Sequence, residues 1–294
     1  MPQPLAPIQA PPPRPPRYGL LAVAPVVDDG DLRPLSAGWN FQPEGCGISG
    51  IGEADCAGNT DLMDPPAQPD SVDGDPLWIW GADECSTFGF NAREWEGRAR
   101  RQLQSTESYQ LANELWDGTV TQAAGLGNRW LAAADALSDT VTNGPSAVAT
   151  ALACVEQGLA ETLYGQQGMI HTTPGVLQHL ATRAHVAKEG NVWVTPMGHV
   201  VVADAGYSGS GPDGTPASTS QWIYGTSFIQ VRLGPVEIIP GGLDDARNLA
   251  AAMDRQLNDI VVYAGRLAGF QWQTECSHIA AEVDIPVCLI EGAS

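Results

Sequence analysis

The residues best suited to chemistry lie together in the stretch GQQGMIHTTPG, residues 165–175. Gly165 and Gly168 precede His171, and the hydroxyls of Thr172 and Thr173 follow it. Such glycines could form a phosphate-binding loop, and a histidine beside hydroxyls could act as a general base. A phosphate loop, however, follows a strand, opens a helix and carries a lysine after its last glycine. Here the glycines follow a predicted helix and open a predicted strand, with no lysine nearby, so the sequence argues against a phosphate loop.

The remaining histidines and serines form no recognisable catalytic pattern. No metal-site spacing such as HExxH occurs among the five histidines, which are His171, His179, His185, His199 and His278. The hydrolase elbow G-x-S-x-G is approached only at GYSGSG, where Ser208 has Gly206 before it but Ser210 in place of the second glycine. This segment reads as a flexible polar loop with no helix after it, so we do not expect a serine hydrolase.

The cysteines and the paired carboxylates have structural explanations. No CxxC pair, as a zinc site would use, occurs among Cys46, Cys56, Cys85, Cys154, Cys276 and Cys288. Without a secretory signal or a long apolar run, we expect mostly buried thiols, with Cys46 and Cys56 left open as a pair. Cys154 and Cys276 lack a defined catalytic neighbour, while Asp244 and Asp245 suit a helix N-terminus. The sequence therefore predicts no catalytic, cofactor-binding or metal-binding residues.

Composition and charge restrict the partners. The 294 residues carry a net charge of −20, which argues against direct affinity for nucleic acid because phosphate contacts need clustered Lys and Arg. Only 16% of the residues are charged, so much of the surface is expected to lie against partners, and nine tryptophans suit such interfaces. Lys188 is the single lysine, which nearly excludes lysine-based cross-linking.

The N-terminal part differs from the rest of the chain. Residues 1–19 are rich in proline and are expected to form an extended, polyproline-like arm that becomes ordered against a partner, with a disordered tail as the alternative for an isolated monomer. Residues 1–84 hold 13 acids and three arginines, half of the net negative charge, in short apolar stretches between Pro, Gly and Asp. This region has no obvious core of its own and is expected to pack on something else.

The later part predicts mixed helices and strands. The clearest helix is 91–117, about 40 Å long at 1.5 Å per residue, which suggests a spine spanning the molecule. A second helix is predicted at 145–164, ended by Gly165, then a strand at 168–171 and a helix begun by Pro174. Further strands are predicted at 191–195, 199–207, 221–225, 227–239, 259–272 and 278–290, with a helix at 243–256. The fold class is α+β.

The order of these elements resembles the capsid-forming fold of tailed bacteriophages and encapsulins, known after phage Hong Kong 97. The long helix ends in LWDGT, a second helix leads to GMIHTTPGVLQHL, and the strand MGHVVVADAGY follows. The strings FIQVRLGPVEII, DDARNLAAAMDRQ, DIVVYAGRLAGF and HIAAEVDI complete the order. The resemblance covers about residues 85–294, and Arg266 in YAGRLA stands where the family has an arginine in a late strand.

The resemblance implies a Hong Kong 97-like phage capsid fold with a long spine helix, a peripheral domain, an axial domain and an extended N-terminal arm. The implied division is a proline-rich arm at 1–42, an acidic extended-loop region at 43–84, the spine helix and part of the peripheral domain at 85–145, the axial domain at 146–235, and a return to the peripheral domain with the C-terminal strands at 236–294. GMIHTTPG is then a strand-to-helix junction, and His171 is a hydrogen-bonded structural residue.

The function that the resemblance implies is not enzymatic. It is that of a tailed-phage major capsid protein, which self-assembles through hexamers and pentamers into an icosahedral head enclosing double-stranded DNA without sequence-specific binding. No cofactor and no membrane are expected. Separate scaffolding, portal and decoration proteins are the other expected partners, and the expected location is the virion, assembled in the bacterial host cytoplasm. Lys–Asn cross-linking is not expected, because Lys188 is the single lysine.

Three alternatives remain open at this point. The first is an encapsulin-type compartment of the same fold, which holds protein cargo. The second is another virion component, a decoration or tail-tube protein that assembles as trimers or rings. The third is an enzyme of unknown type that uses His171 or Cys276.

Overall fold

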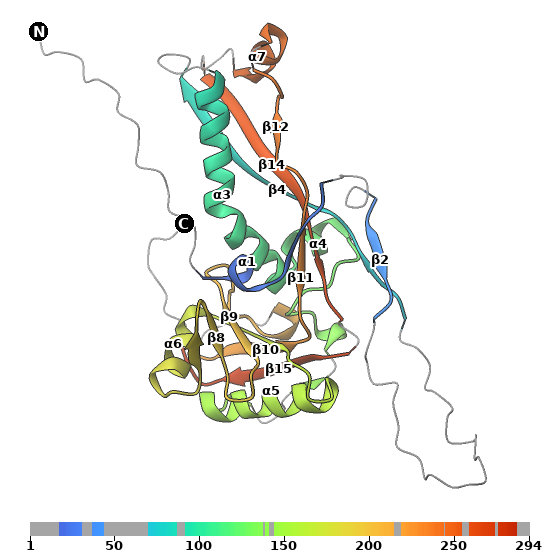
Figure 1. Ribbon diagram of the computed structural model, residues 1–294, viewed down its shortest axis with the longest axis vertical. Helices are drawn as coiled ribbons and strands as arrows, with labels where there is room; N and C mark the ends of the chain where they lie inside the picture. The colour runs from blue at the N-terminus through green and yellow to red at the C-terminus, as the bar shows by residue number, and fades with distance from the viewer. Residues whose placement is uncertain are drawn as a thin grey trace, which may run out of the picture.

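The computed structural model describes residues 18–30, 37–43, 70–86, 92–137, 139–140, 144–214, 219–243, 245–254, 259–273 and 276–286. These residues form an elongated half built along one long helix and a rounder half built around a second sheet (Figure 1). The helices are α1 (Leu20–Val23), α3 (Ala92–Asp117), α4 (Thr119–Ala124), α5 (Val148–Thr162), α6 (Pro174–Thr182) and α7 (Ala246–Ala252). None of the helices in these ranges combines the length and apolarity needed to cross a membrane.

The elongated half contains a six-stranded sheet organised around β14 (Asp259–Gln271). One edge of β14 pairs antiparallel with all of β4 (Leu77–Ser86). The other edge pairs in turn with three shorter strands, namely β13 (Met253–Asp254), β12 (Glu237–Ile239) and β11 (Gln230–Leu233). Strand β1 (Val26–Asp28) extends the sheet by pairing in parallel with β11. The sheet therefore joins the N-terminal and C-terminal parts of the chain.

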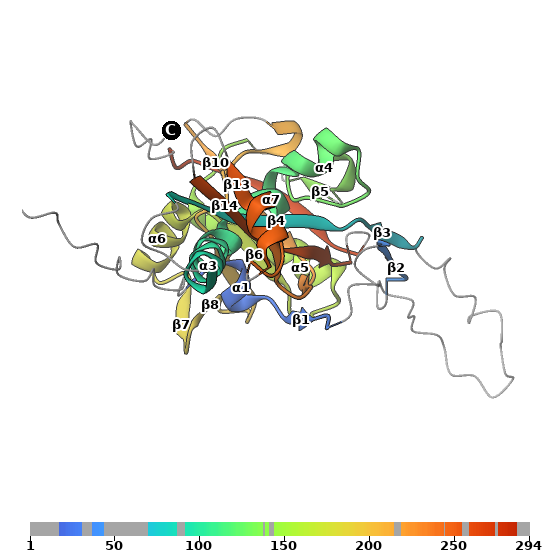
Figure 2. The same cartoon turned by 90° about the horizontal axis from the view of Figure 1, so that it is seen from above.

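Helix α3 lies along one face of the β4–β14 pair, on the same side as α1 (Figure 2). Alternate residues of β4 point toward this helix. Ile79 is buried there, and Asp83 accepts a 2.8 Å hydrogen bond from Arg98 Nε of α3. At Gly81, between them, an added Cβ would lie 2.3 Å from the backbone nitrogen of Leu103. The helix therefore packs directly on the strand backbone at this point.

The rounder half contains a seven-stranded sheet. Its order is β5 (Asp139–Thr140), β15 (His278–Val283), β10 (Gln221–Thr226), β6 (Met169–Thr172), β9 (Val200–Ala203), β8 (Val192–Val194) and β7 (Ala187–Glu189). Apolar side chains of α5 and α6 cover one face, where they meet Ile170, Val201, Ile223 and Ile279. The other face meets the C-terminal end of α3. Its central strands are therefore covered on both faces, which explains why β6 and β9 are buried at every residue.

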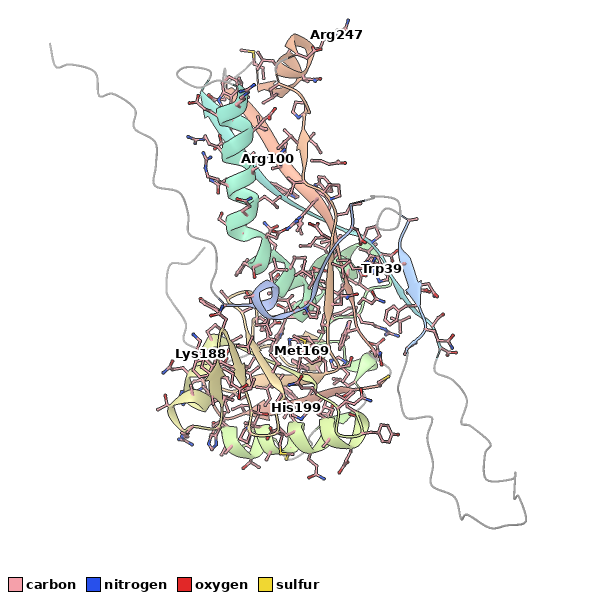
Figure 3. The ribbon with its side chains drawn as sticks, viewed as in Figure 1. Trp39, Arg100, Met169, Lys188, His199 and Arg247 are labelled. Atoms are coloured by element: carbon pink, nitrogen blue, oxygen red, sulfur yellow. The ribbon has the colours of Figure 1, made fainter. Side chains whose placement is uncertain are left out.

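A separate two-stranded hairpin, β2 (Trp39–Phe41) with β3 (Val72–Gly74), precedes β4. The indole of Trp39 holds this hairpin on the larger sheet, because an added Cβ at Gly74 or Gly269 would meet its ring at 2.2 and 2.0 Å. Trp39 therefore lies between the hairpin and β14, as its position in Figure 3 also indicates.

Most of the predicted elements are confirmed. The spine helix, the helix before Gly165, the strand at 168–171 and the helix begun by Pro174 correspond to α3, α5, β6 and α6. The side chain of Thr173 caps α6 by accepting a hydrogen bond from the backbone nitrogen of Val176. The mixed helices and strands confirm the α+β class.

Several details of the prediction are wrong. The stretch 227–239 forms two strands, β11 and β12, separated at Gly234 and Pro235, because proline cannot donate to a ladder. The helix predicted at 243–256 is the shorter α7, and Met253 continues into a strand instead. The region before residue 85, by contrast, packs on the rest of the chain as expected, because Leu20 and Leu77 are buried in the main core.

Candidate functional site

The strongest sequence candidate, His171, lies at the centre of the seven-stranded sheet and is fully buried. Its Nδ1 lies 2.9 Å from the hydroxyl of Tyr207, and its Nε2 lies 3.0 Å from Thr226 Oγ1. Thr226 already donates its proton to the carbonyl oxygen of Ser227, so it accepts from His171. The proton of the neutral ring is therefore on Nε2, and Nδ1 accepts from Tyr207.

Burial keeps His171 neutral. Loss of hydration, together with the nearby His278, lowers the pKa of His171 from 6.5 to about 3. Burial and the Asp204 carboxylate raise the pKa of Tyr207 well above 10, so this phenol remains a donor. Both groups are enclosed and satisfied, and no substrate can approach them from solvent. His171 is thus a hydrogen-bonded structural residue, as predicted.

The free energy of unfolding should fall as the pH is lowered through the histidine range. His171 has a folded pKa of about 3 and an unfolded pKa near 6.5, so between these values only the unfolded state takes up the proton. Its contribution is complete above pH 6.5 and is lost toward pH 3, amounting to about 2 kcal/mol between pH 7 and pH 5. The pKa of His199 is also lowered by burial and adds in the same direction. Urea denaturation at several pH values measures this slope.

The matched variants for this measurement are His171→Gln and His179→Gln, the latter at an exposed position of α6. His171→Gln should reduce the change in the free energy of unfolding between pH 7 and pH 5. It should also lower the free energy of unfolding at pH 7, because a buried hydrogen bond is altered. The second should leave the slope unchanged. If the free energy of unfolding of the His171 variant depended on pH as strongly as that of the unsubstituted protein, the assignment of this residue as a buried neutral base would be contradicted.

The two glycines before His171 serve the backbone. Gly165 ends the turn after α5 with φ of +78°, a left-handed conformation that favours glycine. Gly168 allows a close approach, since an added Cβ would lie 2.7 Å from the carbonyl oxygen of Thr226 on the neighbouring strand. Its backbone nitrogen donates to Nδ1 of His199 at 3.0 Å. The stretch is therefore a strand-to-helix junction.

The polar segment around Ser208 is anchored, which corrects the expectation of a flexible loop. The hydroxyls of Ser208 and Ser210 both donate to Asp117 Oδ1 at the end of α3, at 2.9 and 2.6 Å. Trp116 Nε1 and the Tyr224 hydroxyl each donate to the carbonyl oxygen of Ser210 at 3.1 Å. These bonds fasten the end of the spine helix to the seven-stranded sheet, and among the described residues no histidine is a partner of the two serines.

A buried carboxylate that the sequence analysis missed fixes the start of the described chain. Asp204, only 3% exposed, accepts hydrogen bonds from the backbone nitrogens of Leu20 and Gly206 and from the hydroxyl of Ser108. The four-residue helix α1 is thereby tied to both α3 and β9. In the sequence, Asp204 could be noticed only as an acid that directly follows a predicted apolar strand. Asp204 is therefore the anchor of the N-terminal segment.

Replacing Asp204 by asparagine should loosen α1 at a cost of about 2 kcal/mol, because both carboxylate oxygens accept hydrogen bonds and the amide nitrogen that replaces one of them can only donate. Hydrogen exchange of the amides at Leu20–Val23 should accelerate, as followed by mass spectrometry. Ser108→Ala removes one donor and keeps the carboxylate, so it should have a smaller effect, about 1 kcal/mol. Unchanged exchange at α1 in the asparagine variant would show that the carboxylate does not hold this helix.

The other sequence candidates are scattered. Cys154 is a free, half-buried thiol in α5, whereas Cys276 is disulfide-bonded, which corrects the expectation of a reduced thiol there. Asp245 caps α7 by accepting from the backbone nitrogen of Arg247, as predicted for a helix N-terminus. Cys46, Cys56 and Asp244 lie outside the described residues. Lys188 lies on β7 at the outer edge of the rounder half (Figure 3).

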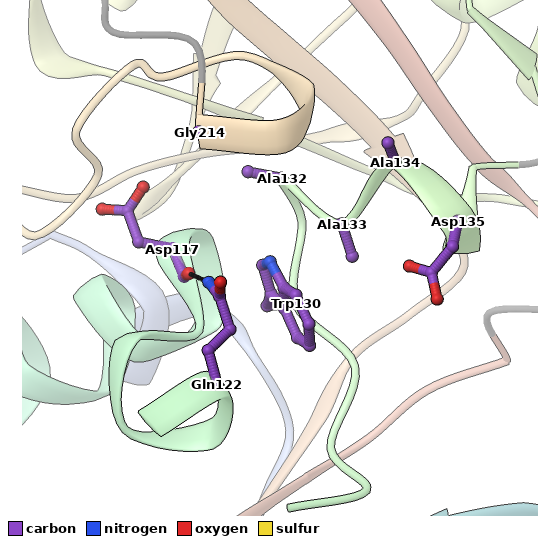
Figure 4. A pocket seen from close by; sticks show the side chains of 8 residues that line it. All are labelled: Asp117, Gln122, Trp130, Ala132, Ala133, Ala134, Asp135 and Gly214. Carbon is purple, nitrogen blue, oxygen red and sulfur yellow. Dashed lines mark hydrogen bonds between the residues drawn. The ribbon is translucent and has the colours of Figure 1, made fainter. Parts of the chain in front are cut away.

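The described residues offer no arrangement that resembles a catalytic centre. They contain no cluster of three or more His, Cys, Asp or Glu side chains that could hold a metal ion. A cavity of about 290 Å³ lies beyond the end of α3, lined by Asp117, Gln122, Trp130, Ala132, Ala133, Ala134, Asp135 and Gly214 (Figure 4). Asp117 Oδ1 already accepts from Ser208 and Ser210, Asp135 pairs with Arg129 at 3.5 Å, and alanines form much of the remaining wall.

Exposed aromatic side chains gather instead on the sheet of the elongated half. Trp78 and Trp80 of β4 and Tyr263 of β14 are 39%, 49% and 39% exposed, with Ile239 of β12 beside them. We call these four residues the aromatic face. In the sequence, Trp78 and Trp80 lie in one of the short apolar stretches before residue 85, where Leu77 and Ile79 are equally apolar. The sequence therefore contains no signal that the two tryptophans are exposed while their neighbours are buried.

The architecture has counterparts among solved structures. No family model matches the sequence, and a comparison with curated proteins found no match. The capsid of Ralstonia phage GP4 aligns with a TM-score of 0.54 at 10% identity, over 95% of this chain and 94% of that one. The capsid of an empty GTA particle aligns at 0.52 and 12% identity, over 95% and 99%. The SrpI encapsulin of Synechococcus elongatus PCC 7942 aligns at 0.52 and 9% identity, over 98% and 96%.

The chain therefore has the Hong Kong 97-type capsid fold, an α+β architecture in which a long helix lies along a sheet and leads to a second, separately covered sheet. Proteins with this fold include both phage capsids and an encapsulin, so the resemblance inferred from the sequence is confirmed at the level of fold.

Proposed function

We propose that this protein is the shell subunit of an icosahedral particle, and more specifically the major capsid protein of a tailed bacteriophage. The observation that carries the proposal is the extent of the structural match. It spans nearly the whole of this chain and nearly the whole of the matching capsid chains. A subunit of this form acts by tiling with copies of itself, so its partners are hexamers and pentamers of the same chain and its location is the virion.

The two sheets support a proposed division into domains. The seven-stranded sheet with α5 and α6 is proposed as the axial domain, which in the sequence-based division is residues 146–235, but β11 (Gln230–Leu233) in that range pairs with β14 in the six-stranded sheet. The spine helix α3 with the six-stranded sheet is proposed as the peripheral domain. Strand β15 joins β10 in the first of these sheets, so the proposed axial domain also recruits residues 278–283. The hairpin β2–β3 forms the base of the proposed extended loop.

The absence of catalysis is part of the same proposal. His171, the best candidate for a base, is enclosed by its own hydrogen bonds, and the paired serines are bound to Asp117. The net charge of −20 supports a DNA container over a DNA-binding protein, because an acidic wall does not adhere to phosphate. An encapsulin compartment is the second candidate, supported by the SrpI match.

Electron microscopy of the full-length chain, expressed alone and with a scaffolding protein, tests the proposal. We expect closed shells or hexameric and pentameric capsomers in negative stain. Purified particles are then treated with nuclease, and their contents are analysed. Protected double-stranded DNA from infected cells identifies a phage head, whereas a stoichiometric protein cargo identifies a compartment.

Uniform monomers or dimers under both expression conditions would contradict a shell subunit. Rings or tubes of a single diameter would instead indicate a tail-tube or decoration protein. The His171→Gln variant serves as a control for catalysis, because loss of a defined enzymatic activity in that variant, with assembly intact, would reopen the enzymatic alternative.

A further inference from the structure

The aromatic face lies on the side of the sheet opposite α3. Residues of β4 alternate, so Trp78 and Trp80 point away from the helix that Ile79 and Gly81 contact. Tyr263 and Ile239 are direct partners in the β12–β14 ladder and share the same side. The face is thus formed by three neighbouring strands.

The four side chains form a fixed platform. Trp80 and Tyr263 meet edge to face, with ring centroids 5.7 Å apart. Trp78 lies over Gly265, where an added Cβ would come within 2.5 Å of its ring. The missing side chain of Gly265 thereby leaves room for the indole to lie across β14. A preorganised aromatic platform loses little side-chain freedom when a partner binds.

The platform is apolar at its centre and acidic at its edges. Trp80 remains 49% exposed and Ile239 46% exposed, an unusual concentration of large apolar groups at the surface of one sheet. Glu84 lies four residues after Trp80 on β4, and Glu237 of β12 pairs with Gly265, which is also the partner of Trp80. Both carboxylates therefore lie on the same side of the sheet as the aromatic residues, and both are exposed. A suitable partner is therefore apolar, extended and weakly basic.

Residues 1–17 have this chemistry. Eight of these residues are proline, Leu5 and Ile8 add apolar bulk, and the only charged side chains are Arg14 and Arg17. Proline-rich segments adopt the polyproline II conformation at low entropic cost and dock on aromatic surfaces. At about 3.1 Å per residue, 17 residues span about 53 Å, more than the roughly 33 Å length of a ten-residue strand such as β4.

We propose that the aromatic face binds the proline-rich segment 1–17 of a second copy of this chain. The segment joins the described chain at Tyr18 and α1, and α1 packs on the α3 side of the sheet (Figure 2). The aromatic face lies on the opposite side, because Trp78 and Trp80 alternate with the β4 residues that contact α3. Tyr18, which directly follows the segment, is therefore on the far side of the sheet from the platform of its own chain. In this arrangement the two arginines meet the carboxylates of Glu84 and Glu237. The proposal rests on the proposed function, since it needs copies in contact.

Photo-cross-linking of the full-length protein tests this pairing. A chain with Ile8→benzoylphenylalanine is co-assembled with an unsubstituted chain labelled with ¹⁵N, irradiated, and analysed by mass spectrometry. We expect cross-links from position 8 to residues 77–84 or 261–265 of the ¹⁵N-labelled chain. The matched variants place Trp80→Ala or Tyr109→Ala in the labelled chain. Tyr109 is equally exposed on α3 but lies outside the platform.

Trp80→Ala should lower the yield of cross-links about tenfold, as expected for a central aromatic contact, and Tyr109→Ala should leave it unchanged. Cross-links found only within one chain would overturn the assignment to a second copy. Shells that form without any cross-link to β4 or β14 would overturn this inference while leaving the proposed function intact. Failure of both assembly and cross-linking would count against both.

Discussion

Replacing Arg266 by methionine should destabilise the folded subunit by about 3–5 kcal/mol, because it leaves the Glu107 carboxylate buried without its cation. Arg266 Nε of β14 donates to Glu107 Oε1 of α3, and the two side chains are only 17% and 8% exposed. Their pairing joins the spine helix to the central strand in the middle of the elongated half. Chemical denaturation of the full-length protein measures the loss directly.

Two further variants separate the ion pair from general effects of the substitution. Arg100→Met makes the same change at an exposed position of α3 (Figure 3) and should alter stability by less than about 0.5 kcal/mol. The double variant Arg266→Met with Glu107→Leu should recover much of the loss, because no buried charge remains. A double variant as unstable as the single one would show that packing, and not charge, governs this position.

Gly81→Ala should cost about 3 kcal/mol, at the upper end for overpacking, because the atoms opposite the new methyl group belong to backbone. The added Cβ would lie 2.3 Å from Leu103 N and 2.8 Å from Leu103 Cα, so α3 has to move away from β4. Separation at this point also weakens the neighbouring contacts. Thermal unfolding and a crystal or electron-microscopy structure of the variant would reveal the displacement.

The matched control is the same substitution on the helix itself. At Gly97 an added Cβ meets nothing closer than the side chain of Arg101 at 3.4 Å, and the residue lies inside α3. Gly97→Ala should therefore stabilise the protein by about 0.5–1 kcal/mol through helix propensity. Opposite signs at the two glycines would establish that contact with backbone, and not the identity of the substitution, determines the result. Equal effects would contradict the close approach of α3 to β4.

Local patterns in the sequence were sufficient for the helices and for the strand-to-helix junction. The apolar spacing of α3, the stop at Gly165, and the Thr173 cap with Pro174 in the first turn of α6 all depend on neighbouring residues. The structural role of His171 was implied by the resemblance in the order of elements, which places this residue at a strand-to-helix junction. Its partners Tyr207 and Thr226 could not be identified.

What escaped prediction depends on residues far apart in the chain. The ladder of β4 with β14, the ion pair of Glu107 with Arg266, and the bond from Leu20 to Asp204 each join distant segments. Likewise, Trp78 and Trp80 could be recognised as exposed only once α3 was known to cover the opposite face of β4. Local propensity contains no information on such pairings, and only tertiary structure supplies it.

The order in which the chain is synthesised gives the pairing of β4 with β14 a further consequence. Strand β4 and the spine helix leave the ribosome early, but the strand that completes their sheet is β14, and the other sheet is not continuous until β15 arrives between β5 and β10. Neither sheet can close until nearly the whole polypeptide has emerged. Trp80 and Tyr263 meet only at that stage, so an unfinished chain displays no complete aromatic face.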